Sequence, residues 1–329
     1  MWQHFELIGS GLYFPNKHVS AEEIDKRAGL PAGWTRQHTG VLNRHECVAP
    51  ESLANMAREA ILSALNDAKL KLNDIDMLID ASTCHHQPIP CNAAIVQSCL
   101  GPQARGIPCL DVHSTCLGFV VALNVANGLL ATDVCQRVVI VCSEAGLLGV
   151  NWNHPESAAL MGDGASAVVL QRAGKTPTYR FCQQTFTEHL PLCQIRGGGH
   201  IFPPTEYSAE TDEAFRFSMN GPKLFRVACK HLPKMARELI TGAELHDENR
   251  LHIIPHQASP KAVATIGALL RWPEDRYHNR VPGMGNLAAA GIPAVLHQCR
   301  QESLICKNDP VLLLGTSAGY SQAGLLFRM

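Results

Sequence analysis

The chain has 329 residues, of which 46% are hydrophobic and 17% are charged, and its formal net charge is −1. This composition is typical of a globular protein with a large core, and it excludes both a disordered chain and the basic surface that nucleic-acid binding requires. No apolar run reaches the length of a membrane span, and the first residues lack the charged and apolar regions of a secretory signal. We therefore expect a cytoplasmic protein that binds neither membrane nor nucleic acid.

The thirteen cysteines do not form a disulfide framework or a metal site. Their number is odd, there is no Cys-x-x-Cys, and most lie in apolar runs, where cysteine acts as a small hydrophobic residue in a reducing compartment. The stretch CHHQPIPC (84–91) has the residue types of a zinc site, but its spacing fits no common site and a second ligand pair is missing. We expect no metal.

The predicted elements occur in two similar series along the chain. Residues 52–69 have helical periodicity and precede a strand at 77–82, and the same order returns with a helix at 223–240 and a strand at 251–257. The runs at 111–130 and 137–146 have counterparts at 281–296 and 310–319. The offsets are similar: 251 − 77 = 174 for the strands, 286 − 116 = 170 for Asn286 and Cys116, and 319 − 146 = 173 for two glycines. A nearly constant offset predicts a duplicated α/β unit.

The strands read as continuous apolar runs, which predicts sheets covered on both faces. We therefore expect an α/β fold of five layers, αβαβα, with two similar halves, 1–175 and 176–329, in one compact unit. Helices rich in Ala and Gly would pack between the two sheets. The segment at about 185–220 is rich in Gly and Pro and lacks periodicity; it either caps a site or is a surface excursion.

Three polar residues lie at predicted strand-to-helix junctions. Cys116 is expected in the first turn of a helix, where unpaired N–H groups lower a thiol pKa and supply thiolate. His256 ends a strand in the other half, and Asn286 precedes the second central helix. If a pseudo-twofold axis relates the halves, the three side chains converge in one buried pocket. Each residue taken alone also has a structural explanation: Cys116 could fill the core, His256 could cap the following helix, and Asn286 could supply a turn.

At this point the chain resembles a known family, the thiolase-fold condensing enzymes, and specifically β-ketoacyl-[acyl-carrier-protein] synthase III and its relatives. Seven segments carry the resemblance in the family's order: LIGSGLYFP (7–15), GWTRQHTGVLNR (33–44), DVHSTCLGF (111–119), MGDGASAVVL (161–170), PHQAS (255–259), GNLAAAGIP (285–293) and GTSAGYSQAGLLF (315–327).

The resemblance implies a decarboxylative Claisen condensation without a cofactor. Cys116 would accept an acyl group from a thioester, and the backbone N–H groups of Cys116 and Gly319 would form the oxyanion hole. His256 and Asn286 would donate hydrogen bonds to a malonyl thioester, whose enolate attacks the acyl-enzyme to give a 3-oxoacyl thioester. Three alternatives remain: transfer of the acyl group to an alcohol or amine, condensation with another β-keto thioester, and a non-catalytic subunit of a heteromeric synthase.

Further residues of the binding path follow from the resemblance. By the resemblance, Trp34 matches the tryptophan on which the family stacks the adenine of coenzyme A. The arginine on the other side of the adenine is replaced by Pro155 in this chain, and a second arginine is replaced by His38. Ile89 stands where a phenylalanine often reaches across the dimer into the acyl pocket, which could admit a longer chain or be neutral drift. Met219 and Gly221 are also assigned to substrate or carrier binding, although an asparagine that contacts pantetheine is replaced by Pro222.

These departures make coenzyme A a doubtful donor and favour a specialised relative that serves lipid or secondary-metabolite assembly. Acyl carrier proteins are acidic, and Arg226, Lys230 and Lys261 are candidates for docking one; a solvated helix face is the alternative. A homodimer is implied by the family alone.

Overall fold

The computed structural model describes residues 2–243, 245 and 248–329. Its first sheet has the strand order β1-β7-β6-β4-β5. The strands are β1 (Gln3–Tyr13), β4 (Met77–Asp80), β5 (Cys109–Asp111), β6 (Arg137–Ala145) and β7 (Asp163–Thr176). β4 pairs in parallel with β5 and β6, whereas β7 is antiparallel to β1 and β6. β6 is buried along almost its whole length, as its unbroken apolar run predicts.

The second sheet has the strand order β11-β12-β13-β8. Its strands are β8 (Arg180–Thr185), β11 (His252–Pro255), β12 (Pro310–Ser317) and β13 (Ser321–Arg328). β11 and β12 are parallel, and β13 is antiparallel to both β12 and β8. All strands of the first sheet end by residue 176 and all strands of the second begin at residue 180 or later. That the halves 1–175 and 176–329 are separate units of folding stays a prediction.

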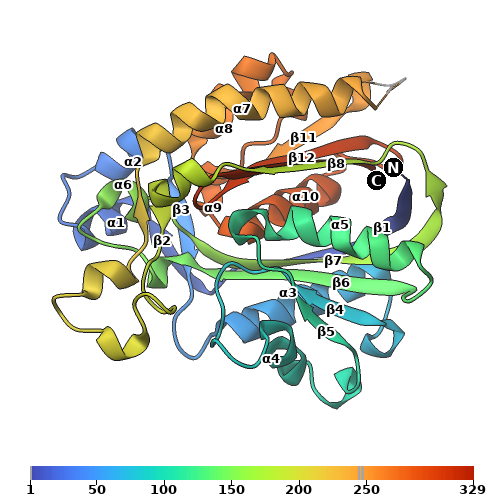
Figure 1. Ribbon diagram of the computed structural model, residues 1–329, viewed down its shortest axis with the longest axis horizontal. Helices are drawn as coiled ribbons and strands as arrows, with labels where there is room; N and C mark the ends of the chain where they lie inside the picture. The colour runs from blue at the N-terminus through green and yellow to red at the C-terminus, as the bar shows by residue number, and fades with distance from the viewer. Residues whose placement is uncertain (1, 244, 246–247) are drawn as a thin grey trace.

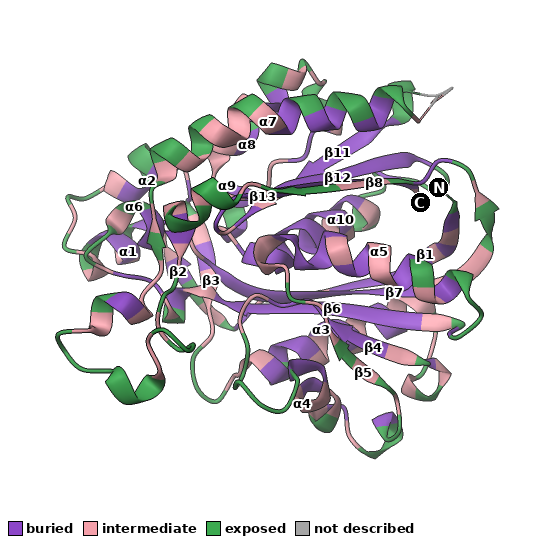
Figure 2. Cartoon of the chain, in the orientation of Figure 1, coloured by how far each residue is buried: buried purple, intermediate pink, exposed green. Residues whose placement is uncertain are grey.

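The helices complete five layers, which Figure 1 shows edge-on. They are α3 (Leu53–Ala68) and α4 (Asn92–Cys99) outside the first sheet, α5 (Gly118–Ala131) and α10 (Gly291–Gln301) between the sheets, and α7 (Gly221–Thr241) and α8 (Pro260–Leu270) outside the second. One apolar cluster fills the central layer and joins both sheets, and two others lie beneath the outer helices. Figure 2 shows the consequence, with strands and central helices buried and the outer helices exposed on one side. The predicted αβαβα arrangement is confirmed.

Side chains at the helix starts fix where three of the outer-layer elements begin. Ser52 accepts a hydrogen bond from the Asn55 N–H at the start of α3, and Ser259 accepts one from the Ala262 N–H at the start of α8. Asn220 caps α7 in the same way, by accepting from the Lys223 N–H. Each cap satisfies a backbone donor that the helix itself leaves unpaired.

The structure confirms the duplication and corrects its alignment. The matched strands β1/β8, β7/β13, β6/β12 and β4/β11 follow the same order in the two sheets. A short 3₁₀ turn, η3 (Thr115–Leu117), precedes α5, and η10 (Ala288–Ala290) precedes α10, at an offset of 288 − 115 = 173. Both turns begin with a left-handed residue, Thr115 at φ 46° and Ala288 at φ 43°. The residue equivalent to Cys116 is therefore Ala289 and not Asn286, which lies two residues before its turn.

Short elements surround the edge of the molecule at which the central helices begin. They are β2 (Lys17–Ser20), α1 (Ala21–Arg27), α2 (Trp34–Thr39), β3 (Asn43–Glu46), α6 (Pro155–Ala158), β9 (Cys193–Gln194), β10 (Ser218–Met219) and α9 (Val281–Met284). The start of the 185–220 segment contacts the Gly319 turn: the Gly319 N–H donates to the Cys193 carbonyl at 2.7 Å. This contact favours a cap over a surface excursion. Within the part of the chain that the structure describes, no helix has the length and apolar character needed to cross a bilayer.

Candidate active site

Cys116 lies in the η3 turn, directly before α5 rather than in its first turn. The residue as a whole is partly exposed, whereas its sulfur is buried. Two backbone N–H groups, its own and that of Ala318, face the sulfur and favour the thiolate. Burial of the sulfur opposes them and dominates, with smaller contributions from Cys193 and Glu144, so the pKa of the Cys116 thiol is raised above its ordinary value.

The direction of this pKa shift corrects the expectation of a helix-activated thiolate. The partial charge at a helix N-terminus acts within the first turn, whereas desolvation acts on the whole buried sulfur. Burial therefore favours the neutral thiol form of Cys116 near pH 7.

His256 follows β11 directly and is fixed by the neighbouring strand. Its N–H donates to the Leu314 carbonyl of β12 at 2.7 Å. The side chain is 8% exposed, and burial lowers its pKa to about 4, so the imidazole is neutral near pH 7. Its Nδ1 is buried without a hydrogen-bond partner among the described residues. A ring nitrogen with no acceptor beside it favours the tautomer that carries the proton on Nε2, which leaves Nε2–H as the donor.

Asn286 is held by the turn that precedes β7. Its N–H donates to the Leu160 carbonyl at 2.8 Å, and its carbonyl accepts from the Gly162 N–H at 3.1 Å. The side-chain Oδ1 accepts from the Ala288 N–H at 2.9 Å. Because the oxygen is engaged in this way, the amide presents its NH₂ group as a donor.

Gly315 of β12 contacts both His256 and Leu117, the residue after Cys116. A Cβ at this position would lie 2.9 Å from the His256 Cβ and 3.1 Å from Cδ2 of Leu117, the residue after Cys116. Asn286 lies two residues before η10, and η10 packs against η3, the turn that carries Cys116. The structure thus brings the three predicted positions to one junction between the halves. Gly315 itself was missed in the sequence, although a glycine that interrupts the apolar run PVLLLG signals a close approach.

Gly319, the predicted second oxyanion donor, is already engaged. Its N–H donates to the Cys193 carbonyl, whereas the preceding N–H, that of Ala318, faces the Cys116 sulfur. Successive N–H groups in this turn point to different partners, so an assignment that is off by one residue names the wrong oxyanion donor. The described hydrogen bonds favour Ala318 over Gly319 for this role.

Two buried charged residues also position the site, and sequence reasoning missed both. Glu144 is fully buried at the end of β6 and accepts from the N–H groups of Thr83 and Cys84 at 2.6 and 3.0 Å. Burial raises its pKa to about 7. Arg44, also fully buried, donates to the carbonyls of Ala159 and Met161 at 2.5 and 3.1 Å and so fixes the turn that holds Asn286. A lone charge inside an apolar run, as in RVVIVCSEAG, is the available signal.

The remaining predicted residues lie around the rim. Met219 in β10 pairs with Cys193, and Gly221 is the first residue of α7. Arg226 on α7 and Lys261 on α8 are exposed on two helices that pack together. Trp34 and His38 stack on each other in α2, and Ile89 is 82% exposed on a loop.

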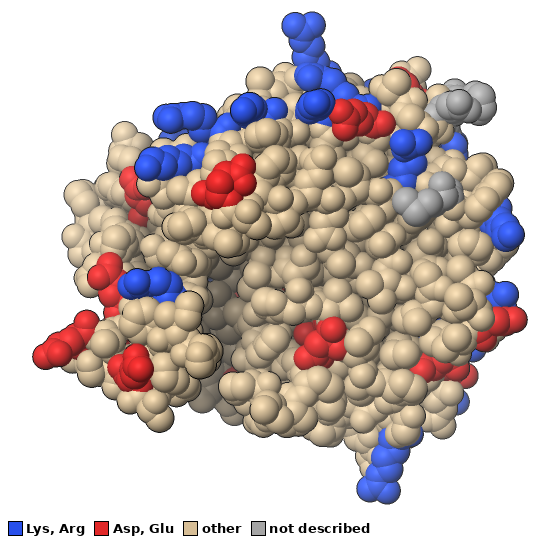
Figure 3. Space-filling view, in the orientation of Figure 1, with Lys and Arg blue, Asp and Glu red and all other residues tan. Residues whose placement is uncertain are grey.

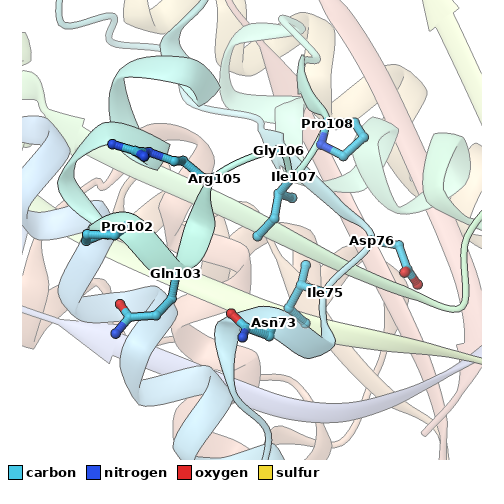
Figure 4. Close-up of a pocket in the computed structure, with 9 residues that line it drawn as sticks. All are labelled: Asn73, Ile75, Asp76, Pro102, Gln103, Arg105, Gly106, Ile107 and Pro108. Carbon is cyan, nitrogen blue, oxygen red and sulfur yellow. The ribbon is translucent and has the colours of Figure 1, made fainter.

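A separate hollow of about 550 Å³ lies far from these residues (Figure 4). Before β4 and β5, at the strand ends opposite those that lead to Cys116, it is lined by Asn73, Ile75, Asp76, Pro102, Gln103 and residues 105–108. Its only carboxylate, Asp76, already accepts the N–H groups of Gln136 and Arg137. Among the described residues, no cluster of three or more His, Cys, Asp or Glu could hold a metal ion.

Comparison with known proteins agrees with this geometry. Residues 110–188 match the family model of 3-oxoacyl-[acyl-carrier-protein] synthase III, and residues 241–329 match the C-terminal model of the same synthase. A β-ketoacyl-[acyl-carrier-protein] synthase III from Neisseria gonorrhoeae is 30% identical over 326 residues, which cover 99% of each chain.

Solved structures show the same fold over the whole chain. The synthase III of Aquifex aeolicus has a TM-score of 0.87 at 24% identity and covers 99% of this chain and 100% of its own. The priming β-ketosynthase of the R1128 polyketide pathway has a TM-score of 0.88 at 23% identity, with coverage of 100% and 97%. With two matching family models and a relative aligned from end to end, the chain belongs to the β-ketoacyl-[acyl-carrier-protein] synthase III family of condensing enzymes.

Proposed function

We propose that this enzyme condenses a Cys116-bound acyl group with a malonyl thioester and that Cys116, His256 and Asn286 carry the reaction. The observation that supports this assignment best is the packing at Gly315, which has His256 and the residue after Cys116 against the same side of one glycine. Such contact between residues from two halves of the chain favours a joint role.

In the first half-reaction, the Cys116 sulfur attacks the thioester carbonyl of the acyl donor. The new carbon–sulfur bond forms as the donor's carbon–sulfur bond breaks, and the proton of the Cys116 thiol ends on the thiol that leaves. The N–H groups of Cys116 and Ala318 stabilise the transient oxyanion. Removal of one such donor typically costs about 3–4 kcal/mol of transition-state stabilisation.

In the second half-reaction, Nε2–H of His256 and the NH₂ of Asn286 donate to the malonyl thioester carbonyl. The electron pair of the breaking carbon–carboxylate bond moves into an enolate as carbon dioxide leaves, and the two donors stabilise the charge where it appears. The enolate carbon then attacks the acyl-enzyme, which releases a 3-oxoacyl thioester and the Cys116 thiolate, and the thiolate takes up a proton from water to restore the resting thiol. These steps use no metal and no redox cofactor.

The surroundings support four further proposals. The exposed cations of α7 and α8 fit an acidic carrier protein. Exposed Ile89 and the open edge of β5, where Leu110 is 37% exposed, fit a second copy of the chain, which native mass spectrometry would detect. The free cysteines of the described chain fit a reducing cytoplasm, and the departures from the family pattern fit a specialised pathway.

The assignment is tested by incubating the enzyme with an acyl donor and labelled malonyl carrier protein. We expect an acyl mass shift on the wild type and on His256→Ala, and none on Cys116→Ala. Wild type should release carbon dioxide with a lengthened product, and His256→Ala should not. Full turnover by His256→Ala would contradict its role, and malonate retained whole in an ester or amide would show acyl transfer instead.

A further inference from the structure

The two proposed donors of the second half-reaction are far apart in the chain. His256 follows β11 directly, and Asn286 comes 286 − 256 = 30 residues later, after α8 and α9. Donors stabilise an enolate well only when they are fixed in place before the charge appears. A side chain that contacts both segments would therefore influence the rate at which carbon dioxide leaves.

The side chain of Gln257 contacts both segments. It is fully buried directly after His256, and each end of its amide is hydrogen-bonded to the backbone. Nε2 donates to the Pro255 carbonyl at 2.6 Å, one residue before His256, and to the His278 carbonyl at 3.1 Å. Oε1 accepts from the Arg280 N–H at 2.8 Å. One neutral amide therefore joins the end of β11 to the segment that leads into α9.

The bond to Arg280 reaches Asn286 through α9. Arg280 is the residue before this helix, and Asn286 is the second residue after it. Because α9 has four residues, about one turn, its start and its end move together. On the other side of Asn286, a Cβ at Gly291, the first residue of α10, would lie 3.4 Å from the Gln257 Cβ. Gln257 therefore contacts the chain both before and after Asn286.

The equivalent position in the other half of the fold has a different side chain with a different partner. His256 and Ala81 both donate their N–H groups to the neighbouring strand, so Gln257 corresponds to Ser82. The Ser82 Oγ accepts from the Ser143 N–H of β6 at 2.8 Å, which is a bond between neighbouring strands. The duplicated fold alone does not require a glutamine here. The glutamine occurs in the half that carries both donors.

Loss of the Gln257 amide should shift the donors without unfolding the site. The His278 N–H still donates to the Ile253 carbonyl of β11 at 3.1 Å, and the Asn286 N–H to the Leu160 carbonyl at 2.8 Å. What is lost is the contact that joins the two segments. Because a displacement of about 1 Å costs about 100-fold in rate, a shift of a few tenths of an ångström should cost about tenfold.

We propose that Gln257 is a positioning residue for decarboxylation, which fixes His256 and Asn286 relative to each other through its hydrogen bonds to the end of β11 and the start of α9. This inference rests on the proposed function, because it presumes that both residues donate to the malonyl carbonyl. Acylation of Cys116, in the other half of the fold, does not depend on this amide. Replacement of Gln257 also leaves the exposed charges unchanged, including the Lys and Arg side chains that Figure 3 shows over α7.

Gln3 provides the matched control, because its buried amide makes the same set of bonds far from the site. Its Nε2 donates to the Phe5 and Arg328 carbonyls, both at 2.8 Å, and its Oε1 accepts from the Arg328 N–H at 2.9 Å. Gln3 begins β1 and Arg328 ends β13, close to the chain termini that Figure 1 marks. The test compares Gln257→Glu and Gln257→Met with Gln3→Glu and Gln3→Met.

We expect both Gln257 variants to lower kcat for carbon dioxide release at least about tenfold. KM for the malonyl thioester and acylation of Cys116, followed by intact-protein mass spectrometry, should change less than about twofold, because the donors act mainly on the transition state. The Gln3 variants should lose comparable stability and keep wild-type rates when assayed below their Tm.

The pH profile of Gln257→Glu adds a second readout. A neutral carboxyl at this position can still donate to one of the two carbonyls, whereas the ionised form is repelled by both. Burial raises the pKa of such a carboxyl, so kcat relative to wild type should fall as the pH rises from about 5.5 to about 8.5. The same ratio for Gln257→Met should not change in this way.

Wild-type kcat in Gln257→Met would overturn the inference, as would equal losses of acylation and decarboxylation or equal kinetic losses in the Gln3 variants. If Gln257→Met fails to fold, Gln257→Glu at low pH, where the neutral carboxyl keeps part of the bonding, provides the same comparison. A wild type that releases no carbon dioxide from the malonyl thioester, or full turnover by His256→Ala, would instead contradict the proposed function on which the inference rests.

Discussion

Substitution of Gly315 by alanine should separate positioning of the catalytic residues from stability. The added Cβ would lie 2.9 Å from the His256 Cβ, closer than real Cβ contacts, and 3.1 Å from the mobile end of Leu117. The φ of Gly315 lies outside the left-handed region, so these contacts alone determine the effect. Leu117 can rotate its methyl group away, whereas His256 is attached to the strand end and has to move.

We expect the overpacking to destabilise the fold by about 1–3 kcal/mol. Because displacement of a catalytic group by about 1 Å costs about 100-fold in rate, a shift of a few tenths of an ångström should lower the decarboxylation rate about tenfold. Acylation of Cys116 should change less. Carbon dioxide release, the acyl mass shift and thermal unfolding measure the three effects.

Gly324→Ala is the matched control for this variant. Its Cβ would lie 2.4 Å from Cδ1 of Leu239, a flexible side chain of α7 that belongs to the outer layer. This variant should lose comparable stability and keep its decarboxylation rate when assayed well below its Tm. Equal kinetic losses in the two variants, or a wild-type rate in Gly315→Ala, would refute the reasoning.

Three further predictions concern single groups of the site. Because burial raises the Cys116 pKa, alkylation of Cys116 by iodoacetamide, followed on its own peptide, should rise about tenfold per pH unit from pH 7 to 9; a plateau below pH 8 would show a pre-formed thiolate. Asn286→Asp keeps the acceptor for the Ala288 N–H but replaces the NH₂ donor by a negatively charged oxygen. We expect it to lower carbon dioxide release more than about 100-fold, and more than Asn286→Ala does, with acylation of Cys116 retained. Equal losses in the two variants would contradict the donor role. The carboxyl pKa of Glu144 is raised from 4.5 to about 7, so its contribution to stability is full below pH 4.5 and is lost as the pH rises through 7. In urea unfolding, the stability of wild type relative to Glu144→Gln should therefore fall by about 2–3 kcal/mol between pH 5 and pH 8; a constant difference would show that Glu144 does not titrate.

The repeat and the layer order could be predicted from the sequence because they depend on patterns that the chain displays locally. An apolar run such as 138–142 is typical of a strand covered on both faces, and two such runs at one offset indicate two similar sheets. The predicted match of Cys116 with Asn286 was wrong, because a polar residue stands out in the sequence and an alanine does not. Ala289, the true equivalent, carries no signal except its backbone turn.

The details of the site depend on long-range contacts that leave little trace in local sequence. The β9 strand influences which N–H faces the Cys116 sulfur, because it engages the Gly319 N–H while the Ala318 N–H faces the sulfur. The pKa of Cys116 depends on how deeply the sulfur is buried, which the residues around it in the chain do not reveal. The stack of His38 on Trp34 follows from their spacing of four residues on α2, which places both rings on one face of the helix.

The duplicated fold provides equivalent positions in its two halves, but these positions carry different residues. His256 is equivalent to Ala81, since both N–H groups donate to the neighbouring strand, His256 to Leu314 and Ala81 to Val141. Cys116 is equivalent to Ala289, and at the same offset Asn286 is equivalent to His113. In the mechanism that we propose, one half therefore supplies the nucleophile and the other supplies both donors for the enolate. This division suits a two-step reaction, because the acyl group can stay on one half while the second thioester exchanges against the other.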